Sequence, residues 1–202
     1  MPKVKIKRKN RPLDMTAMTD VAFLLLTFFM LTSNFTKKEP VKVDVPSSIS
    51  EIKIPETNVM LVLVDNSGKV FFSVDGQESR KNVLKKMGET YSITFTEKEL
   101  AEFGNMGTFG VPMNMMKAFL NMTPEDRDRS ENALGIPCDS IDNQFKNWVS
   151  AARAEKGPDC IIAIRGDKGT PYPKIKKVMS SLQEITENRY NLITGLQKET
   201  DY

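Results

Sequence analysis

One long apolar segment dominates the hydrophobic pattern of the chain. Residues 21–31 are apolar with the single exception of Thr27. As a helix they would cover about half of a hydrocarbon layer about 30 Å thick, because each residue adds about 1.5 Å. A helix over residues 15–35 is long enough to cross the whole layer. The pattern therefore predicts one transmembrane helix over residues 15–35.

Polar side chains within this segment follow one face of the predicted helix. At about 100° per residue, four of them fall within a sector of roughly 40°: Thr16, Asp20, Thr27 and Asn34. Thr19, Thr32 and Ser33 lie off this polar stripe. A helix that faces a partner or a wetted cavity has a use for such a stripe, whereas a lipid-facing anchor has none.

Asp20 is the candidate functional group of the stripe. An ionised carboxylate more than one turn inside the span costs a few kcal/mol even on the lenient insertion scale, so a membrane acid indicates function. In the competing interpretation the helix simply starts at Asp20. The carboxylate then lies in the headgroup region, where the helix dipole stabilises an anion.

The residues before the helix are basic. Six Lys and Arg side chains precede the first acid, and the rest of the chain holds 23 basic and 26 acidic residues, a net charge of −3. This balance argues against nucleic-acid binding. A basic arm of residues 1–14 beside an apolar helix predicts a cytoplasmic N-terminus and an exported C-terminal part. A cleaved signal peptide or a non-functional signal anchor are the alternatives, but residues 32–36 lack an A-x-A-like cleavage site.

Residues 36–57 read as a linker that contains one strand-like run. Residues 41–45 alternate between apolar and polar side chains, with Val41, Val43 and Val45 on one face and Pro46 as the stop. Such a strand can pair within its own sheet or reach another subunit. Both interpretations remain open from the residues alone.

The remaining residues, 58–202, carry the patterns of a small mixed domain. Two strand-like runs joined by Asn66-Ser67-Gly68 predict a hairpin over residues 58–74. Further strands are expected at residues 91–95, 160–164 and 190–194, and helices at residues 80–87, 97–103, 113–120, 142–155 and from Pro171 or Pro173 onward. Thr96 and Glu99 have the spacing of a capping box at the start of the helix over residues 97–103. Arg165-Gly166-Asp167 is interpreted as a solvated turn. The predicted fold class is α+β, with a single N-terminal transmembrane helix followed by this domain.

Enzymatic chemistry has little support in the sequence. The chain has no histidine, and it lacks a phosphate-binding glycine loop, a G-x-S-x-G elbow and a cysteine pair at zinc spacing. We therefore expect no catalytic residues, metal or cofactor. Cys138 and Cys160 could form a disulfide in an exported domain. Cys160 lies in an apolar run, however, which favours a buried free thiol.

The membrane segment carries a resemblance to a known family. The sequence LDMTAMTDV at residues 13–21, followed by FLLL and FFM, is similar to the transmembrane signature of the ExbD/TolR family of proton-channel subunits. That family has an aspartate at the position of Asp20. It usually has a proline at the position of Ala17 and often an asparagine at that of Asp14. The resemblance resumes at residues 41–46, 61–74 and 162–194, and leaves residues 88–144 as a family-atypical insertion.

The resemblance implies a function and a set of partners. It implies a subunit that harnesses the proton-motive force in the inner membrane of a Gram-negative cell, with Asp20 as the proton carrier. The implied partners are an ExbB/TolQ-like multi-span ring, membrane lipid, a TonB-like protein and a second copy of the chain, which in the family exchanges the segment at residues 41–45. A TolR-like or gliding-type stator bound to peptidoglycan remains an alternative. A passive signal-anchored binding module in the periplasm is the alternative from another class.

The order of the basic arm and the apolar helix gives a topology prediction. A reporter enzyme that works only in the periplasm should be active when it is fused after Asn66, and a cytoplasmic reporter at the same position should be inactive. The reason is that the basic arm holds the N-terminus in the cytoplasm. Paired fusions to a periplasmic and a cytoplasmic reporter measure this directly. Activity of the cytoplasmic fusion alone would contradict the predicted orientation.

Overall fold

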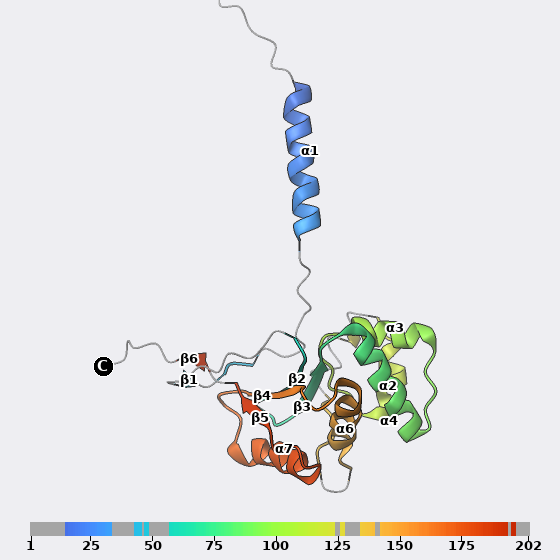
Figure 1. Ribbon diagram of the computed structural model, residues 1–202, viewed down its shortest axis with the longest axis vertical. Helices are drawn as coiled ribbons and strands as arrows, with labels where there is room; N and C mark the ends of the chain where they lie inside the picture. The colour runs from blue at the N-terminus through green and yellow to red at the C-terminus, as the bar shows by residue number, and fades with distance from the viewer. Residues whose placement is uncertain are drawn as a thin grey trace, which may run out of the picture. The chain divides into compact units, whose positions relative to one another are not determined.

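The computed structural model describes residues 15–33, 43–45, 47–48, 57–123, 126–127, 134–139, 142–193 and 195–196. The chain divides into two compact units, Met1–Thr36 and Lys37–Tyr202. The described part of the first unit is helix α1 (Met15–Thr32; Figure 1). This helix begins where the apolar pattern predicts, and it is long and apolar enough to cross a membrane by length and composition.

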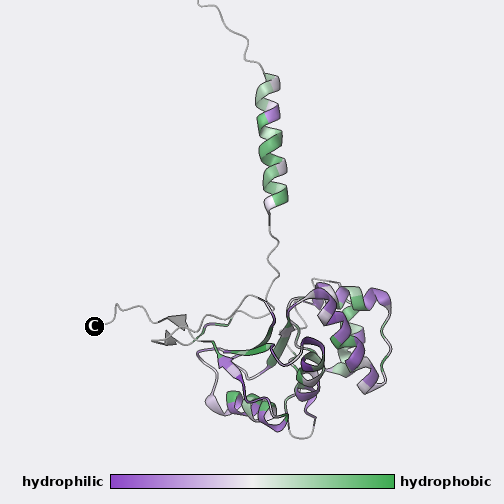
Figure 2. Cartoon of the chain, viewed as in Figure 1, coloured by the Kyte–Doolittle hydropathy of each residue, from purple (hydrophilic) through white to green (hydrophobic). Residues whose placement is uncertain are grey.

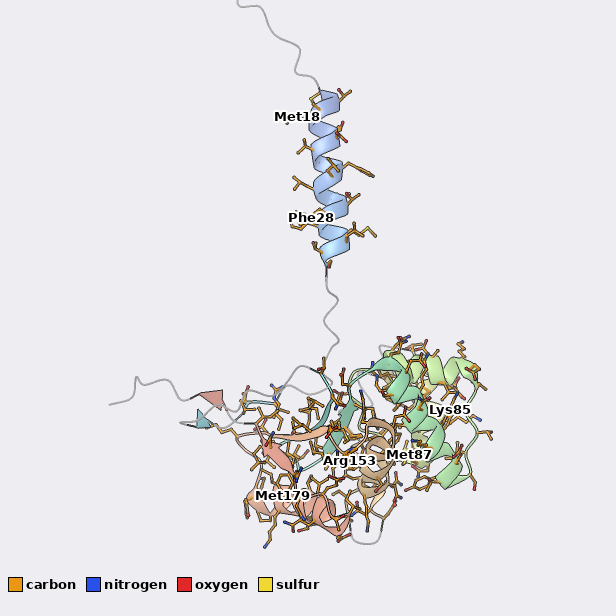
Figure 3. All side chains as sticks on the ribbon, viewed as in Figure 1. Met18, Phe28, Lys85, Met87, Arg153 and Met179 are labelled. Carbon is orange, nitrogen blue, oxygen red and sulfur yellow. The ribbon has the colours of Figure 1, made fainter. Side chains whose placement is uncertain are left out.

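The apolar side chains of α1 are exposed, and no described residue covers them. Every large apolar side chain of the helix is more than half exposed, and Figure 2 shows mostly hydrophobic colouring along it. Met18 and Phe28 project away from the helix axis in Figure 3. Exposure of this much apolar surface is unfavourable in water, so the helix requires lipid or protein around it.

The second unit is built on a four-stranded mixed sheet with the order β3-β2-β4-β5. Its strands are β2 (Val59–Val64), β3 (Val70–Val74), β4 (Ile161–Gly166) and β5 (Tyr190–Leu192). β2 and β3 form the predicted antiparallel hairpin, whereas β4 pairs parallel with both β2 and β5. A separate parallel pair joins β1 (Ser47–Ser48) to β6 (Gly195–Leu196).

Helices cover one face of this sheet. They are α2 (Gln77–Tyr91), α3 (Glu97–Asn105), α4 (Met113–Leu120), α6 (Gln144–Lys156) and α7 (Tyr172–Glu184). Their apolar side chains form one core with the sheet residues of this face: Met60, Val62, Val64, Val70, Phe72, Val74, Ile162 and Ile164. The α+β fold class is therefore confirmed.

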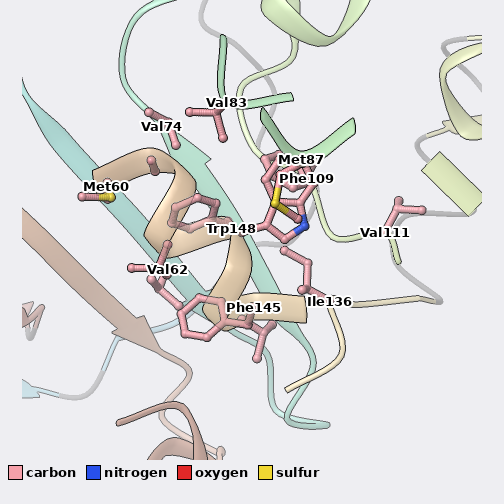
Figure 4. Close-up of a cluster of buried hydrophobic side chains, with 14 of the residues drawn as sticks. Met60, Val62, Val74, Val83, Met87, Phe109, Val111, Ile136, Phe145 and Trp148 are labelled. Carbon is pink, nitrogen blue, oxygen red and sulfur yellow. The ribbon is translucent and has the colours of Figure 1, made fainter. Parts of the chain in front are cut away.

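Aromatic rings fill the centre of this core. The Trp148 ring lies 4.6 Å from that of Phe109 and 5.9 Å from that of Phe103, measured between centroids. All three side chains are fully buried, and Figure 4 shows Trp148 with Phe109 and Met87. Truncating a buried ring of this kind typically costs about 3–5 kcal/mol. Phe103 and Phe109, which lie between α2 and α6 in the sequence, thus belong to the core of the domain.

Segments between residues 88 and 144 also close the outer edge of β3. Backbone hydrogen bonds join Phe72 to Phe109 in both directions, at 2.8 and 2.9 Å, and Ile136 N–H to Val70 C=O at 2.8 Å. The buried Arg80 side chain donates to the carbonyls of Gly104, at 2.9 Å, and Val74, at 2.8 Å. An open sheet edge invites pairing with another chain, so these contacts remove one such edge.

The predicted capping box at Thr96 and Glu99 is confirmed at the start of α3. Burial alone would raise the pKa of the Glu99 carboxyl. Hydrogen bonds from the Thr96 backbone N–H and hydroxyl and from the Asn121 amide outweigh burial and lower this pKa below its usual value. The carboxylate therefore stabilises the fold above the pKa of an unfolded Glu, and this contribution is lost as the pH falls through the folded-state pKa.

Two local predictions are wrong. The strand expected at residues 91–95 does not form, because α2 extends to Tyr91 and ends at Ser92, whose φ of 55° turns the chain. Arg165 and Gly166 lie in β4 and not in a turn. In both cases tertiary contacts override the local pattern. Val43–Val45, the described part of the strand expected at residues 41–45, is irregular in this single chain, and its exchange with a second copy stays a prediction.

The second face of the sheet is covered by irregular segments. Leu63, Phe71 and Ala163 point to this face and are completely buried. At β3, Gly110 lies so close to Phe71 that an added Cβ would come within 2.2 Å of the ring. At β4, the Arg165 guanidinium donates to the Val43 carbonyl at 3.2 Å. The insertion and the linker therefore each cover part of this face.

The close approach at Gly110 gives a stability prediction. Gly110→Ala should lower the free energy of unfolding by about 1–3 kcal/mol, because the new methyl group overpacks against the ring of Phe71. Fluorescence of the single tryptophan, Trp148, reports unfolding of the full chain in detergent. Phe71→Leu removes the ring carbons that clash, so the double variant should lose less stability than the sum of the two single variants. Strict additivity would contradict this account.

Candidate functional site

Asp20 is the only charged residue within residues 15–33. It lies in the second turn of α1, it is exposed, and no described residue makes a hydrogen bond or ion pair with its carboxylate. A carboxylate without partners is expensive to hold in a hydrocarbon layer, and the neutral acid is much cheaper. The role of Asp20 as a proton carrier remains a prediction.

The threonine hydroxyls of α1 bond to the helix backbone. Thr27 Oγ1 donates to the Leu24 carbonyl at 2.9 Å, and Thr32 Oγ1 donates to the Phe28 carbonyl at 2.8 Å. Thr19 Oγ1 lies 3.0 Å from the Met15 carbonyl oxygen and 2.9 Å from that of Thr16. A hydroxyl that donates in this way keeps its lone pairs, so Thr27 can accept a hydrogen bond from a water or a carboxylic acid.

The continuous helix places three residues of the predicted polar stripe on one face. Thr16, Asp20 and Thr27 share this face, whereas Thr32 points to the opposite side. Asn34 lies outside the described residues. Thr27 is about 10 Å from Asp20 along the helix axis, at about 1.5 Å per residue. The two side chains therefore need a water or a partner's polar group to connect them, and their joint role remains a prediction.

The linker residues predicted as an exchanged strand lie partly within the described chain. Val43 is only 4% exposed and Val45 is half-buried, but neither belongs to a strand. Val41 lies outside the described residues. Sequence reasoning missed the two groups that hold this segment, Arg165 and the backbone N–H of Lys168, because nothing in the local pattern around them indicates a contact with residues far earlier in the chain.

Both cysteines are free thiols. Burial raises the pKa of Cys138 and of Cys160, so both thiols are poor nucleophiles. Cys138 Sγ lies 3.2 Å from the Ser181 hydroxyl oxygen. Within the described residues, no cluster of three or more His, Cys, Asp or Glu side chains is arranged to hold a metal ion.

An open cavity of about 910 Å³ lies beside β5, with Arg153 in its wall. The Arg153 guanidinium forms two hydrogen bonds of 2.6 Å with the Glu187 carboxylate. It also donates to the carbonyls of Gly157, Pro158 and Cys160, at 3.0, 3.2 and 2.7 Å. These hydrogen bonds connect α6 to the residues just before β4 and to Glu187 before β5. The role of the Arg153 guanidinium is therefore structural.

An apolar helix with one acid, followed by a small α+β domain, is typical of a membrane-anchored protein with one extramembrane domain. The family model described as "Biopolymer transport protein ExbD/TolR" matches residues 7–108. The chain therefore belongs to the ExbD/TolR family, which is a family of transport and energy transduction. No curated protein and no solved structure matches the chain.

The matched residues reach from the basic arm through α1, the β2–β3 hairpin and α2 to the loop that follows α3. They confirm the resemblance found in the membrane segment. The match extends into the predicted insertion as far as residue 108, and the resemblance at residues 162–194 lies outside it.

The opposite placement of Thr27 and Thr32 gives a matched pair of variants. Thr27→Val should lower proton-driven activity about two- to tenfold, which corresponds to one lost hydrogen bond of about 0.5–1.5 kcal/mol. Thr32→Val removes an equivalent backbone-bonded hydroxyl from the other face and should have little effect. The measurement is growth that depends on proton-driven transport, compared between strains that contain equal amounts of the protein. Equal effects of both variants would exclude a special role for the Thr27 face.

Proposed function

We propose that this chain is the ExbD-like, proton-motive-force-harnessing subunit of an inner-membrane motor complex, with Asp20 as its proton carrier. The observation that carries the proposal is the combination of one acid and an exposed apolar surface on α1. One carboxylate without a partner in the described chain lies on a helix whose large apolar side chains are all more than half exposed. Membership of the ExbD/TolR family supports a stator-type role in biopolymer transport.

The proton gradient supplies the energy. A proton binds to Asp20 from one side of the membrane and leaves it to the other side. Each proton that crosses delivers about 2.3 kcal/mol per 100 mV of membrane potential. The charged and neutral forms of the side chain prefer different surroundings, so protonation changes the preferred position of α1 within an enclosing ring. The proton gradient is thereby converted into movement of the helix.

A single helix cannot enclose a channel, so the mechanism requires partners. The exposed apolar surface of α1 supports an enclosing protein of the ExbB/TolQ type, and family membership supports this association together with self-association. The six basic residues before the first acid support a cytoplasmic N-terminus and a periplasmic domain. The driven component is a TonB-like protein that opens outer-membrane transporters.

The TolR-like alternative differs in what the motor drives. A TonB-like protein that co-purifies after mild detergent extraction supports the ExbD-like function. Retention of the chain by isolated peptidoglycan, without such a protein, supports the stator that is bound to the cell wall.

The role of Asp20 is tested by conservative variants. Asp20→Asn keeps the size and polarity of the side chain but cannot release a proton, so the complex should assemble at normal abundance and fail to drive uptake. Asp20→Glu keeps the chemistry on a longer side chain and should retain partial activity. The measurement is uptake that depends on the proton gradient, with protein abundance matched between strains.

The competing interpretation predicts the opposite result. If Asp20 only caps the helix in the headgroup region, asparagine replaces it almost without loss, because both residues cap helices well. Wild-type uptake by the Asp20→Asn protein would falsify the proton-carrier role.

A further inference from the structure

Two adjoining hollows lie between α7 and residues 134–139 of the predicted insertion. The first has a volume of about 280 Å³ and the second a volume of about 300 Å³. Both are lined by Cys138, Asp139 and Lys177, so the two hollows meet at these side chains. A water molecule takes about 30 Å³ in the liquid, so each hollow has room for a small ligand.

Lysine side chains set the charge of the first hollow. Lys174 and Lys177 line it from neighbouring turns of α7, and Asp139 is the one acid among its described lining residues. Lys177 Nζ lies 3.2 Å from Asp139 Oδ1, but both side chains are more than half exposed, so this ion pair is weak. No described acid forms an ion pair with Lys174. The first hollow therefore has a net positive charge.

A glycine fixes the course of the Lys174 side chain. Gly68 lies in the turn between β2 and β3 with a φ of 81°, and a Cβ added there would come within 2.7 Å of Lys174 Cδ. The aliphatic part of Lys174 thus lies directly across the Gly68 backbone, which only a residue without a side chain permits. A side chain that is already packed loses less conformational freedom when its ammonium group binds a ligand.

The second hollow extends the basic lining along α7. Lys176 and Ser180, one turn apart on the helix, both line it. Its further acid, Glu184, is paired with Lys146 at 3.5 Å, whereas no described acid pairs with Lys176. A ligand with a second acidic group can therefore reach from the first hollow to another ammonium group and a hydroxyl.

We propose that the first hollow binds a phosphate-bearing anion, with Lys174 and Lys177 as the residues that hold it. The lysine ammonium group is a compact point charge with three donors and is a common phosphate ligand. The described lining contains no arginine, whose planar fork favours carboxylates. A phosphate dianion outweighs the single exposed carboxylate of Asp139, with which it competes for Lys177. Soluble phosphates and lipid headgroups both supply this chemistry. The inference goes beyond the proposed function and does not depend on Asp20.

The thiol of Cys138 reports directly on occupancy, because it is partly exposed and lines the hollow. The experiment uses the full chain in mild detergent at low ionic strength, with Cys160→Ala so that one thiol remains. Saturating inorganic pyrophosphate should slow the reaction of Cys138 with a maleimide at least about fivefold. Potassium chloride at the same ionic strength should leave the rate unchanged. A rate that does not respond to pyrophosphate would overturn the site.

Charge variants separate a binding role from a structural one. Lys174→Gln and Lys177→Gln should each raise the pyrophosphate concentration for half-protection about tenfold, because each removes a charged hydrogen bond. Asp139→Asn should lower this concentration about threefold, because it removes the competing carboxylate. Lys85→Gln changes an exposed lysine on α2 (Figure 3) and should have no effect. Equal effects of Lys85→Gln and Lys174→Gln would show unspecific attraction of anions and overturn the proposal.

Reconstitution identifies the source of the phosphate. The full chain is placed in vesicles of phosphatidylcholine alone or with phosphatidylglycerol, and Cys138 is labelled with a membrane-permeant maleimide without added anion. Slower labelling with phosphatidylglycerol, abolished by Lys174→Gln, supports a lipid headgroup as the ligand. Protection by pyrophosphate alone supports a soluble phosphate. The labelling requires no transport, so its outcome is independent of whether Asp20→Asn abolishes uptake.

Discussion

A mixed sheet with helices on one face must obtain cover for its second face from elsewhere in the chain, and much of this structure follows from that requirement. Leu63, Phe71 and Ala163 are fully buried on the second face. The loop around Gly110 covers it beside β3, and the linker at Val43 covers it beside β4. The predicted insertion and the linker therefore each help to complete the fold of the domain.

The membrane helix has the reverse problem, since none of the described residues covers its apolar side chains. Apolar side chains are compatible with lipid, whereas a carboxylate in a hydrocarbon layer needs polar groups around it. The hydroxyl of Thr27 is already bonded to the helix backbone. The helix is thus complete as a secondary structure, while the described part of the chain offers its carboxylate no hydrogen-bond partner.

The sequence predicts the parts of this protein that depend on local patterns. The start of α1, the hairpin of β2 and β3, the helix at residues 113–120 and the capping box at Thr96 all follow from periodicity, turn residues or capping chemistry. The polar stripe follows from helical spacing, and only the position of Asn34 lies beyond the described residues. The family resemblance in the membrane segment is equally local.

Features that depend on distant contacts could not be predicted. Residues 91–95 resemble a strand in sequence. In the structure Tyr91 is instead the last residue of α2, and Ser92 turns the chain. Arg165 reads as part of a solvated turn until β4 is paired with β2, which directs its side chain to Val43. The pairing of Phe72 with Phe109 likewise joins segments whose sequences give no sign of each other.

The parallel pairing of β2 with β4 has a consequence for how the domain forms. Val62 pairs with Ile164, so the central pair of the sheet closes only after nearly all of the domain has been synthesised. Until then the β2–β3 hairpin has an unpaired inner edge rich in valine and leucine. Closure across so long a stretch of chain is slow, and exposed strands of this kind aggregate easily. The inner edge of the hairpin is therefore the part of the nascent domain most exposed to wrong pairing until β4 has been made.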